Sequence, residues 1–263
     1  MSLAARVEGV GLIGPGLAGW PRARDVLCGR AAYAPSPTSI PAPEALPAVE
    51  RRRAGKCVRI ALAAGLEAVA AAGREPRDMG AVFTSSTGDG ENVHAICEML
   101  ASNDRLISPT RFHNSVHNAP AGYWGIATGS RRSADSLAAF DASFGAGVVE
   151  AMSRIAACPD EAVLIIAYDA PYPEPLNATR PIPDAFAVAL ALASTRAATR
   201  GATITLETGA GVADVLDDPQ LERLRRAIPA ARSLPLLRLL AQERNGEATL
   251  DYLEGLSLTL RRS

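Results

Sequence analysis

The chain has 263 residues, 48% of them hydrophobic and 21% charged, so it can bury a full core and most of its length should be ordered. Its 27 basic and 28 acidic residues give a net charge of -1, which removes the electrostatic argument for a nucleic-acid-binding protein. The sequence has no apolar leader and no run of about 18 uncharged apolar residues, so we expect a protein without a membrane span, located in the cytoplasm.

The first half of the chain predicts strands and helices in alternation. Apolar residues recur at spacings of three and four in the helices, and short apolar runs indicate the strands. Prolines mark the long connection. The predicted elements are the strand Val7–Ile13, a short helix Arg24–Cys28, a proline-rich surface loop 35–47, the helix Arg51–Ala72, the strand Gly80–Ser85 and an amphipathic helix that contains Val93, Ile96, Cys97 and Leu100.

The second half continues the pattern and ends in a short tail. Large apolar residues alternate with alanines over Phe186–Leu192, the period of two expected of a strand. Strands interleaved with helices predict a layered α/β sheet covered on both faces. The other predicted elements are the strand Leu137–Ala142, the helix Phe144–Ala157, the strand Ala162–Tyr168, a hairpin from Phe186–Leu192 to Thr203–Glu207 across Arg196–Gly201, the helices Leu221–Ala227 and Leu234–Gln242, and the strand Leu256–Leu260.

Three glycines near the start fit a dinucleotide-binding pattern. Gly9, Gly11 and Gly14 satisfy G-x-G-x-x-G, in which glycines let backbone amides approach a pyrophosphate at a helix start. Pro15 and Gly16 follow where that helix would have to begin. The context therefore argues against a dinucleotide site, and we predict no cofactor.

Cysteines and histidines offer no metal site. The four cysteines are far apart and form no C-x-x-C pair, which predicts reduced thiols. His113 and His117 have the spacing of the zinc motif H-E-x-x-H, but no glutamate lies between them. Only His94 remains as a third histidine, so we predict hydrogen-bonded histidines at a buried interface and no metal. The cysteines are Cys28, Cys57, Cys97 and Cys158.

Asp141 begins a strand-to-helix connection, D-A-S-F-G-A-G. Sharp turns of this kind are where α/β enzymes place a nucleophile, because a helix N-terminus favours an anion. A carboxylate is a weak acyl-transfer nucleophile compared with a thiolate. We predict that Asp141 caps the helix, which contributes about 1 kcal/mol, with catalysis by Asp141 as the alternative.

The segment Phe140 to Ala151, F-D-A-S-F-G-A-G-V-V-E-A, resembles the active-site turn of β-ketoacyl synthases of the thiolase superfamily. In that family a strand delivers a cysteine, followed by small residues and an Ala-rich helix. Asp141 stands where that cysteine would stand. Other segments fall in the family's order, so the resemblance covers about residues 5 to 208. They are V-E-G-V-G-L-I-G-P-G at 7–16, the helix 51–73, A-V-F-T-S-S-T-G-D-G at 81–90, I-S-P-T-R-F at 107–112 and the strand pair at 185–204.

Residues 113–124, H-N-S-V-H-N-A-P-A-G-Y-W, resemble the short ketosynthase-like chain length factors of aryl polyene pigment clusters. The resemblance implies a truncated thiolase-like fold, in which the ketosynthase N-terminal half forms a layered α/β/α sheet. Residues 1–210 would form this domain. Residues 211–263 would form a small tail of helix and strand packed on it.

The departures from the family imply a chain that does not condense acyl groups alone. A ketosynthase loads an acyl chain onto its cysteine and uses two histidines of its second half in malonyl decarboxylation and oxyanion binding. Here the cysteine is absent, and all three histidines precede the Asp141 turn. The resemblance therefore implies a heterodimer with an active β-ketoacyl synthase in polyketide (aryl polyene) or fatty-acid-type biosynthesis, with acyl carrier protein reached through that partner.

In the chain-length-factor arrangement the growing chain runs through the dimer interface, where bulky side chains of this subunit line or end the tunnel. Ordinary core packing is the alternative for each such side chain. Two other functions stay open: a stand-alone acyl-thioester hydrolase or decarboxylase that uses Asp141 or His117, and a homodimeric scaffold for acyl carriers. The tunnel or interface candidates are Val93, Ile96, Leu100, Phe112, His113, His117, Tyr123, Trp124, Phe140 and Phe144.

Overall fold

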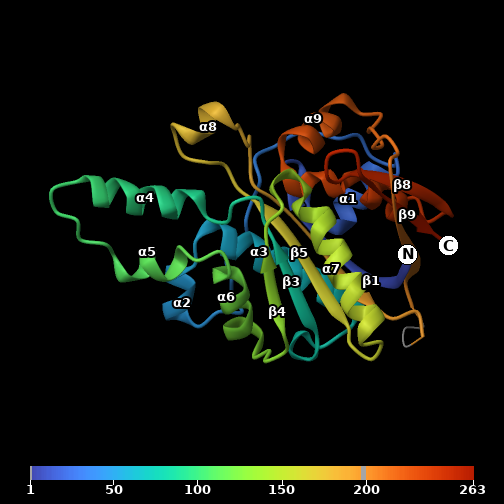
Figure 1. The fold of residues 1–263 in the computed structure, drawn as a ribbon, viewed down its shortest axis with the longest axis horizontal. Helices are drawn as coiled ribbons and strands as arrows, with labels where there is room; N and C mark the ends of the chain where they lie inside the picture. The colour runs from blue at the N-terminus through green and yellow to red at the C-terminus, as the bar shows by residue number, and fades with distance from the viewer. Residues whose placement is uncertain (1, 197–199) are drawn as a thin grey trace.

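The computed structural model describes residues 2–196 and 200–263, and these form one mixed sheet of nine strands (Figure 1). The strand order is β4-β3-β5-β6-β1-β7-β9-β8, and the short β2 pairs with β1. β3 lies parallel to β4 and β5, whereas the other neighbours are antiparallel. The strands are β1 (Leu3–Gly14), β2 (Leu17–Ala18), β3 (Gly80–Thr84), β4 (Ala134–Leu137), β5 (Val163–Asp169), β6 (Phe186–Ala193), β7 (Ala202–Gly209), β8 (Gly246–Asp251) and β9 (Ser257–Arg262).

Helices cover both faces of this sheet. The long helix α3 packs on β1, β6 and β5 on one face, and α7 packs on β5 and β3 on the other. This arrangement confirms the expected layered α/β/α fold. The helices are α1 (Trp20–Leu27), α2 (Ala48–Arg53), α3 (Lys56–Ala72), α4 (Gly90–Ala101), α5 (Pro109–Asn114), α6 (Ala119–Thr128), α7 (Ser143–Ala157), α8 (Leu176–Thr179), α9 (Pro219–Ala227) and α10 (Leu234–Ala241), with short 3-10 turns η1 (Pro76–Asp78), η2 (Phe140–Ala142) and η3 (Pro229–Ser233).

The glycines of the G-x-G-x-x-G pattern have a packing role. A Cβ atom on Gly9 would lie 2.1 Å from the carbonyl oxygen of Ala68, and one on Gly11 would lie 2.0 Å from that of Ala64. Both carbonyls belong to α3, so the glycines allow this helix to lie directly against β1. The pattern therefore reflects close helix–sheet contact in this chain.

The alternation in β6 has a related cause. Its large side chains, among them Val188 and Leu190, belong to the core cluster on the α7 face, whereas its alanines belong to the cluster on the α3 face. The strand is thus buried on both faces, although its sequence alternates. Small residues on one face let α3 approach closely.

Two predicted elements are wrong in their pairing or length. The strands β6 and β7 do not form a hairpin, because β1 lies between them and pairs with both. Part of the connection, residues 197–199, lies outside the described residues. The helix predicted from Arg51 to Ala72 is two helices, α2 and α3, separated at Ala54 and Gly55. The backbone of Gly55 is extended there, which separates the two helices.

The strand predicted over Leu137–Ala142 is also wrong in its extent. β4 ends at Leu137, and the chain then turns through η2 before α7 begins. Phe140 has a φ of +52°, which ends the extended conformation. The residues of β4 are partly exposed because β4 is an edge strand that pairs with β3.

The tail extends the same sheet. β9 pairs with β7, and β8, which was not predicted, pairs with β9. The predicted helices near residues 221–227 and 234–242 are present as α9 and α10. The division of the chain at residue 210 stays a prediction.

Candidate functional site

Parallel strands β3, β4 and β5 bring their carboxyl ends to one edge of the sheet. Loops that follow such ends are where open α/β sheets place their functional groups. Here the loops carry Ser85 and Ser86 after β3, Asp141 after β4, and Asp169 at the end of β5. The turn η3 of the tail contacts the turn η2 and β5 at this edge.

The carboxylate of Asp141 is held by two arginines. One carboxylate oxygen lies 2.5 Å from Nη2 of Arg180, and the other lies 2.9 Å from Nη2 of Arg232. The predicted capping role is wrong, because Asp141 accepts no hydrogen bond from the first turn of α7. Ser143 instead closes the turn, with its hydroxyl accepting from the Ala139 amide and donating to the Phe140 carbonyl. Two guanidinium groups thus occupy the oxygens that would have to attack an acyl group.

Phe140 is displayed at the surface of this turn. Its side chain is 60% exposed, and its backbone has the left-handed conformation that residues other than glycine rarely adopt. The guanidinium of Arg180 stacks over the ring at 3.5 Å from its centroid. Arg180 therefore fixes both Asp141 and Phe140.

A buried polar network lies beneath the turn. The Asp169 carboxylate is buried and accepts hydrogen bonds from the Ser86 amide at 2.9 Å and the Ser86 hydroxyl at 2.7 Å. Its second oxygen accepts from the amide of Ala230 in η3 at 2.8 Å. The Tyr172 hydroxyl lies 3.0 Å from that of Ser86. Asp169 thereby joins the ends of β3 and β5 to the tail.

Burial raises the pKa of Asp169 from its usual 3.8 to about 6, in spite of these donated hydrogen bonds. The folded chain therefore binds this proton more tightly than the unfolded chain, and the stability due to Asp169 falls as the pH rises from about 4 to about 6. The total change is about 3 kcal/mol. We expect urea unfolding at several pH values to show this loss, and the non-titrating variant Asp169→Asn to lack it. The same pH profile in both proteins would contradict the assignment.

The sequence did not predict three of these residues. Arg180 and Arg232 lie in loops or short turns with no periodic pattern, and they reach Asp141 only through the fold. Asp169 had a usable signal, because this acidic residue ends the apolar run of β5.

The predicted apolar face of α4 lies at the surface. Val93 is 41% exposed and Leu100 is 49% exposed, while Ile96 is half-buried. α4 and α5 form an arm that projects from the body of the sheet (Figure 1). Phe112 on α5 is 67% exposed. These four candidates are therefore available for contact with another molecule.

Three other candidates lie in the core. Tyr123, Trp124 and Phe144 are each at most 2% exposed. Trp124 packs edge-to-face on Phe83 with ring centroids 6.4 Å apart, and the Tyr123 hydroxyl donates to Asn114. This burial favours a packing role for the three aromatic residues.

The two histidines of the H-x-x-x-H pair do not share a helix, because α5 ends at Asn114. His113 is exposed and contacts the edge of the Tyr123 ring. His117 lies with Nε2 3.4 Å from the carbonyl oxygen of Ser85, near the end of β3. Within the described residues, no cluster of three histidine, cysteine or acidic side chains is placed to hold a metal ion.

The family model described as "Beta-ketoacyl synthase, N-terminal domain" matches residues 27–251. The chain belongs to this family. No curated protein matches the sequence of this chain. In the part of the chain that the structure describes, no helix has both the length and the apolar character needed to cross a membrane.

Solved structures that contain ketosynthases share the fold. One chain of the complex between the ketosynthase ApeO and its chain length factor ApeC, from Xenorhabdus doucetiae, is 21% identical with a TM-score of 0.75, and the alignment covers 99% of this chain and 100% of that one. The ishigamide ketosynthase/chain length factor gives 13% identity and a TM-score of 0.73, with 99% of each chain covered. A chain of the complex AntDE:AntF, a type II polyketide synthase acyl-carrier protein with its ketosynthase, is 13% identical with a TM-score of 0.74. The alignment covers 100% of this chain and 99% of that one.

Proposed function

We propose that this chain is a non-catalytic ketosynthase-like subunit that pairs with an active β-ketoacyl synthase and shapes the tunnel for its growing chain. The observation that carries the proposal is the turn η2, where a carboxylate bound by two arginines stands at the position that the family resemblance assigns to the nucleophilic cysteine. The proposed pathway class is polyketide biosynthesis of the aryl polyene type.

The chemistry of the turn supports the proposal that no acyl chain is loaded onto this subunit. Ketosynthases hold the growing chain as a thioester, which requires a thiolate that attacks and later leaves. Asp141 offers a carboxylate instead of a thiolate, and its two oxygens accept hydrogen bonds from Arg180 and Arg232. The chain would therefore depend on a partner for the acyl-enzyme.

The surface next to the turn supports pairing. β4 is an edge strand with one side open, and open edges offer a ready template for another chain. Large apolar side chains are exposed on the arm, on α6 and at the turn, which suits an interface. They are Val93, Leu100, Leu106, Phe112, Val116, Ile126 and Phe140.

The identity of the partner is proposed from the relatives. Two of the similar structures are described as ketosynthases with a chain length factor, and a third contains an acyl-carrier protein with its ketosynthase. A β-ketoacyl synthase is therefore the expected partner, and the acyl carrier protein would deliver substrate to that partner.

Reconstitution tests the proposal. Acyl-carrier thioesters are incubated with this chain, with a co-encoded ketosynthase, or with the co-purified pair, and the carrier-bound products are measured by mass spectrometry. We expect elongated products with the pair and none with this chain. Thioester hydrolysis or decarboxylation by this chain alone would favour the enzyme alternative. A stable homodimer that binds acyl carrier protein but no ketosynthase would favour the scaffold alternative.

A second experiment concerns product length. If exposed residues of α4 end the tunnel, Leu100→Ala or Val93→Ala should lengthen the products of the pair by further two-carbon units at a similar rate, because a smaller side chain removes a steric stop. Trp124→Ala is the contrasting variant, since truncation of a buried aromatic costs about 3–5 kcal/mol of stability. Unchanged lengths in soluble pairs carrying Leu100→Ala and Val93→Ala would show that these residues do not measure the chain.

A further inference from the structure

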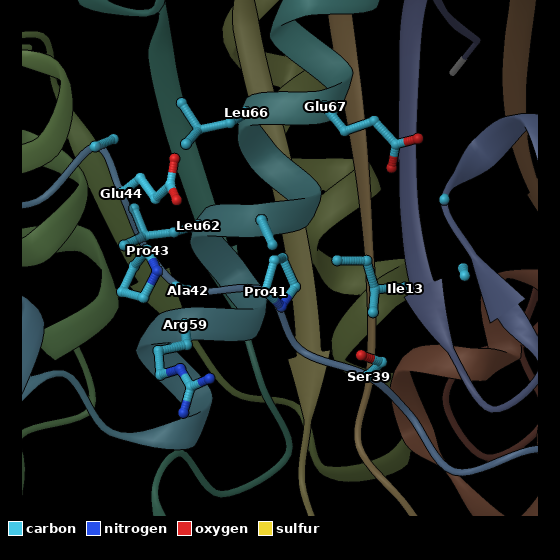
Figure 2. A pocket seen from close by; sticks show the side chains of 14 residues that line it. Ile13, Ser39, Pro41, Ala42, Pro43, Glu44, Arg59, Leu62, Leu66 and Glu67 are labelled. Atoms are coloured by element: carbon cyan, nitrogen blue, oxygen red, sulfur yellow. The ribbon is translucent and has the colours of Figure 1, made fainter.

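A cavity of about 680 Å³ lies between α3 and the proline-rich segment 39–45 (Figure 2). It is on the face of the sheet that α3 covers, whereas α7, which follows the Asp141 turn, covers the opposite face. Its walls are mainly apolar and include Ile13, Pro41, Pro43, Leu62 and Leu66. The volume is within the range of roughly 300–1,000 Å³ that is usual for small-molecule sites.

The proline-rich wall is held in place at both ends. The amide of Thr38 donates to the Asp184 carboxylate at 2.8 Å, and its hydroxyl donates to the Ala185 carbonyl at 2.7 Å. At the other end, the Arg51 guanidinium donates to the carbonyls of Glu44 and Leu46. These bonds keep the segment from closing onto α3, so the cavity is formed before a ligand binds.

Arg59 supplies the only positive charge among the described residues that line the cavity. Each oxygen of the Glu67 carboxylate already accepts from a backbone amide, of Leu12 at 2.9 Å and of Trp20 at 2.6 Å. Arg59 donates one bond, from Nη2 to the Ile40 carbonyl at 3.2 Å. Arg59 forms no ion pair with any residue of 2–196 or 200–263, and its Nη1 makes no hydrogen bond within these residues. The half-buried guanidinium group therefore has donors left for a ligand.

We propose that this cavity binds a small monocarboxylate with an apolar chain. The planar guanidinium of Arg59 matches a carboxylate, to which it can donate paired hydrogen bonds. Figure 2 shows Arg59 one helical turn before Leu62, with Leu66 a further turn along α3, so an apolar chain can extend over these leucines beneath the prolines. Glu44 also lines the cavity and repels any acidic group of a ligand, so only the one that pairs with Arg59 is compensated. The site is independent of the proposed pairing with a ketosynthase.

Titration calorimetry with octanoate tests the proposal on the whole chain. We expect saturable binding of octanoate, and binding at least about tenfold weaker for octanamide, which has the same shape without the charge. Arg59→Gln should weaken octanoate binding by a similar factor. Ala63→Phe, which places a ring in the cavity, should abolish it. Arg52→Gln is the matched control, because Arg52 is an exposed arginine on α2 outside the cavity, and it should bind as the wild type does.

Failure of the folded wild-type chain to bind octanoate would overturn the proposal. So would equal affinity for octanoate and octanamide, or equal octanoate binding by Arg59→Gln and Arg52→Gln. If Arg59→Gln does not fold, the comparison of the two ligands on the wild type and the result for Ala63→Phe still decide the question.

Discussion

Asp141→Asn should leave the rate of condensation by the heterodimer within about twofold of the wild-type rate. Replacing the nucleophilic cysteine of the partner ketosynthase by alanine should lower that rate by a factor of about 10³ or more. The acyl-enzyme is expected on the partner, so chemistry does not require the Asp141 carboxylate. The asparagine keeps the shape of the side chain but weakens its bonds to Arg180 and Arg232. We expect a stability loss of about 1–2 kcal/mol, seen as a lower melting temperature.

The matched control for this variant is Asp25→Asn. Asp25 lies on α1 and pairs with Arg30 at 2.8 Å, so the control removes the same kind of charge from a carboxylate–arginine pair away from the turn and from the β4 edge. Products are quantified by mass spectrometry on pairs of equal stoichiometry. Loss of turnover in Asp141→Asn, with an intact complex and a normal control, would make Asp141 catalytic and favour the hydrolase or decarboxylase alternative.

Ser136→Pro should weaken binding of the ketosynthase partner by a factor of about 10² or more. In the parallel ladder, the amide of Ala81 donates to the Ser133 carbonyl and that of Ser85 donates to the Leu137 carbonyl. Residues 133 and 137 thus face β3, and alternation turns the backbone of Ser136 outwards. Proline there removes an outward N–H and places its ring on the edge, so a partner strand that pairs with this edge loses a ladder hydrogen bond and meets the ring.

The fold should survive this substitution, because proline is tolerated on an open edge. Ser136→Ala keeps the backbone amide and serves as the control, with the melting temperature of each variant measured beside its affinity for the partner. A folded Ser136→Pro chain that binds the ketosynthase as tightly as Ser136→Ala does would show that the β4 edge is not the interface.

Local patterns were sufficient to predict the elements that lie deepest in the core. The helical spacing around Leu62 and Leu66, the apolar run of β5 and the alternation of β6 each reflect contacts with the layers directly above or below the element. The family was predicted from the Asp141 turn together with the other resembling segments in their order over about residues 5 to 208. Each of these signals lies within a short stretch of sequence.

Strand pairing and burial were decided by the tertiary structure. Nothing local in Phe186–Leu192 or Thr203–Glu207 indicates that β1, from the start of the chain, lies between them. Val93 and Trp124 are both apolar, yet one is exposed on an arm and the other is enclosed by α3 and β3. These outcomes depend on contacts between distant segments, which the spacing of residues in the sequence does not encode.

The sequence by itself therefore determined the layered α/β architecture, the family and the presence of a carboxylate at the turn that resembles the family's active-site turn. Only the tertiary structure decided what that carboxylate does, because Arg180 and Arg232 are far from Asp141 in the chain and reach it only when α8 and the tail pack against the turn. A helix-capping bond involves only neighbouring residues, so the local sequence suggested that Asp141 caps α7. The structure does not contain this bond. Two guanidinium groups brought in by the fold compete more strongly for the carboxylate than the helix amides do, because both partners of these hydrogen bonds are charged.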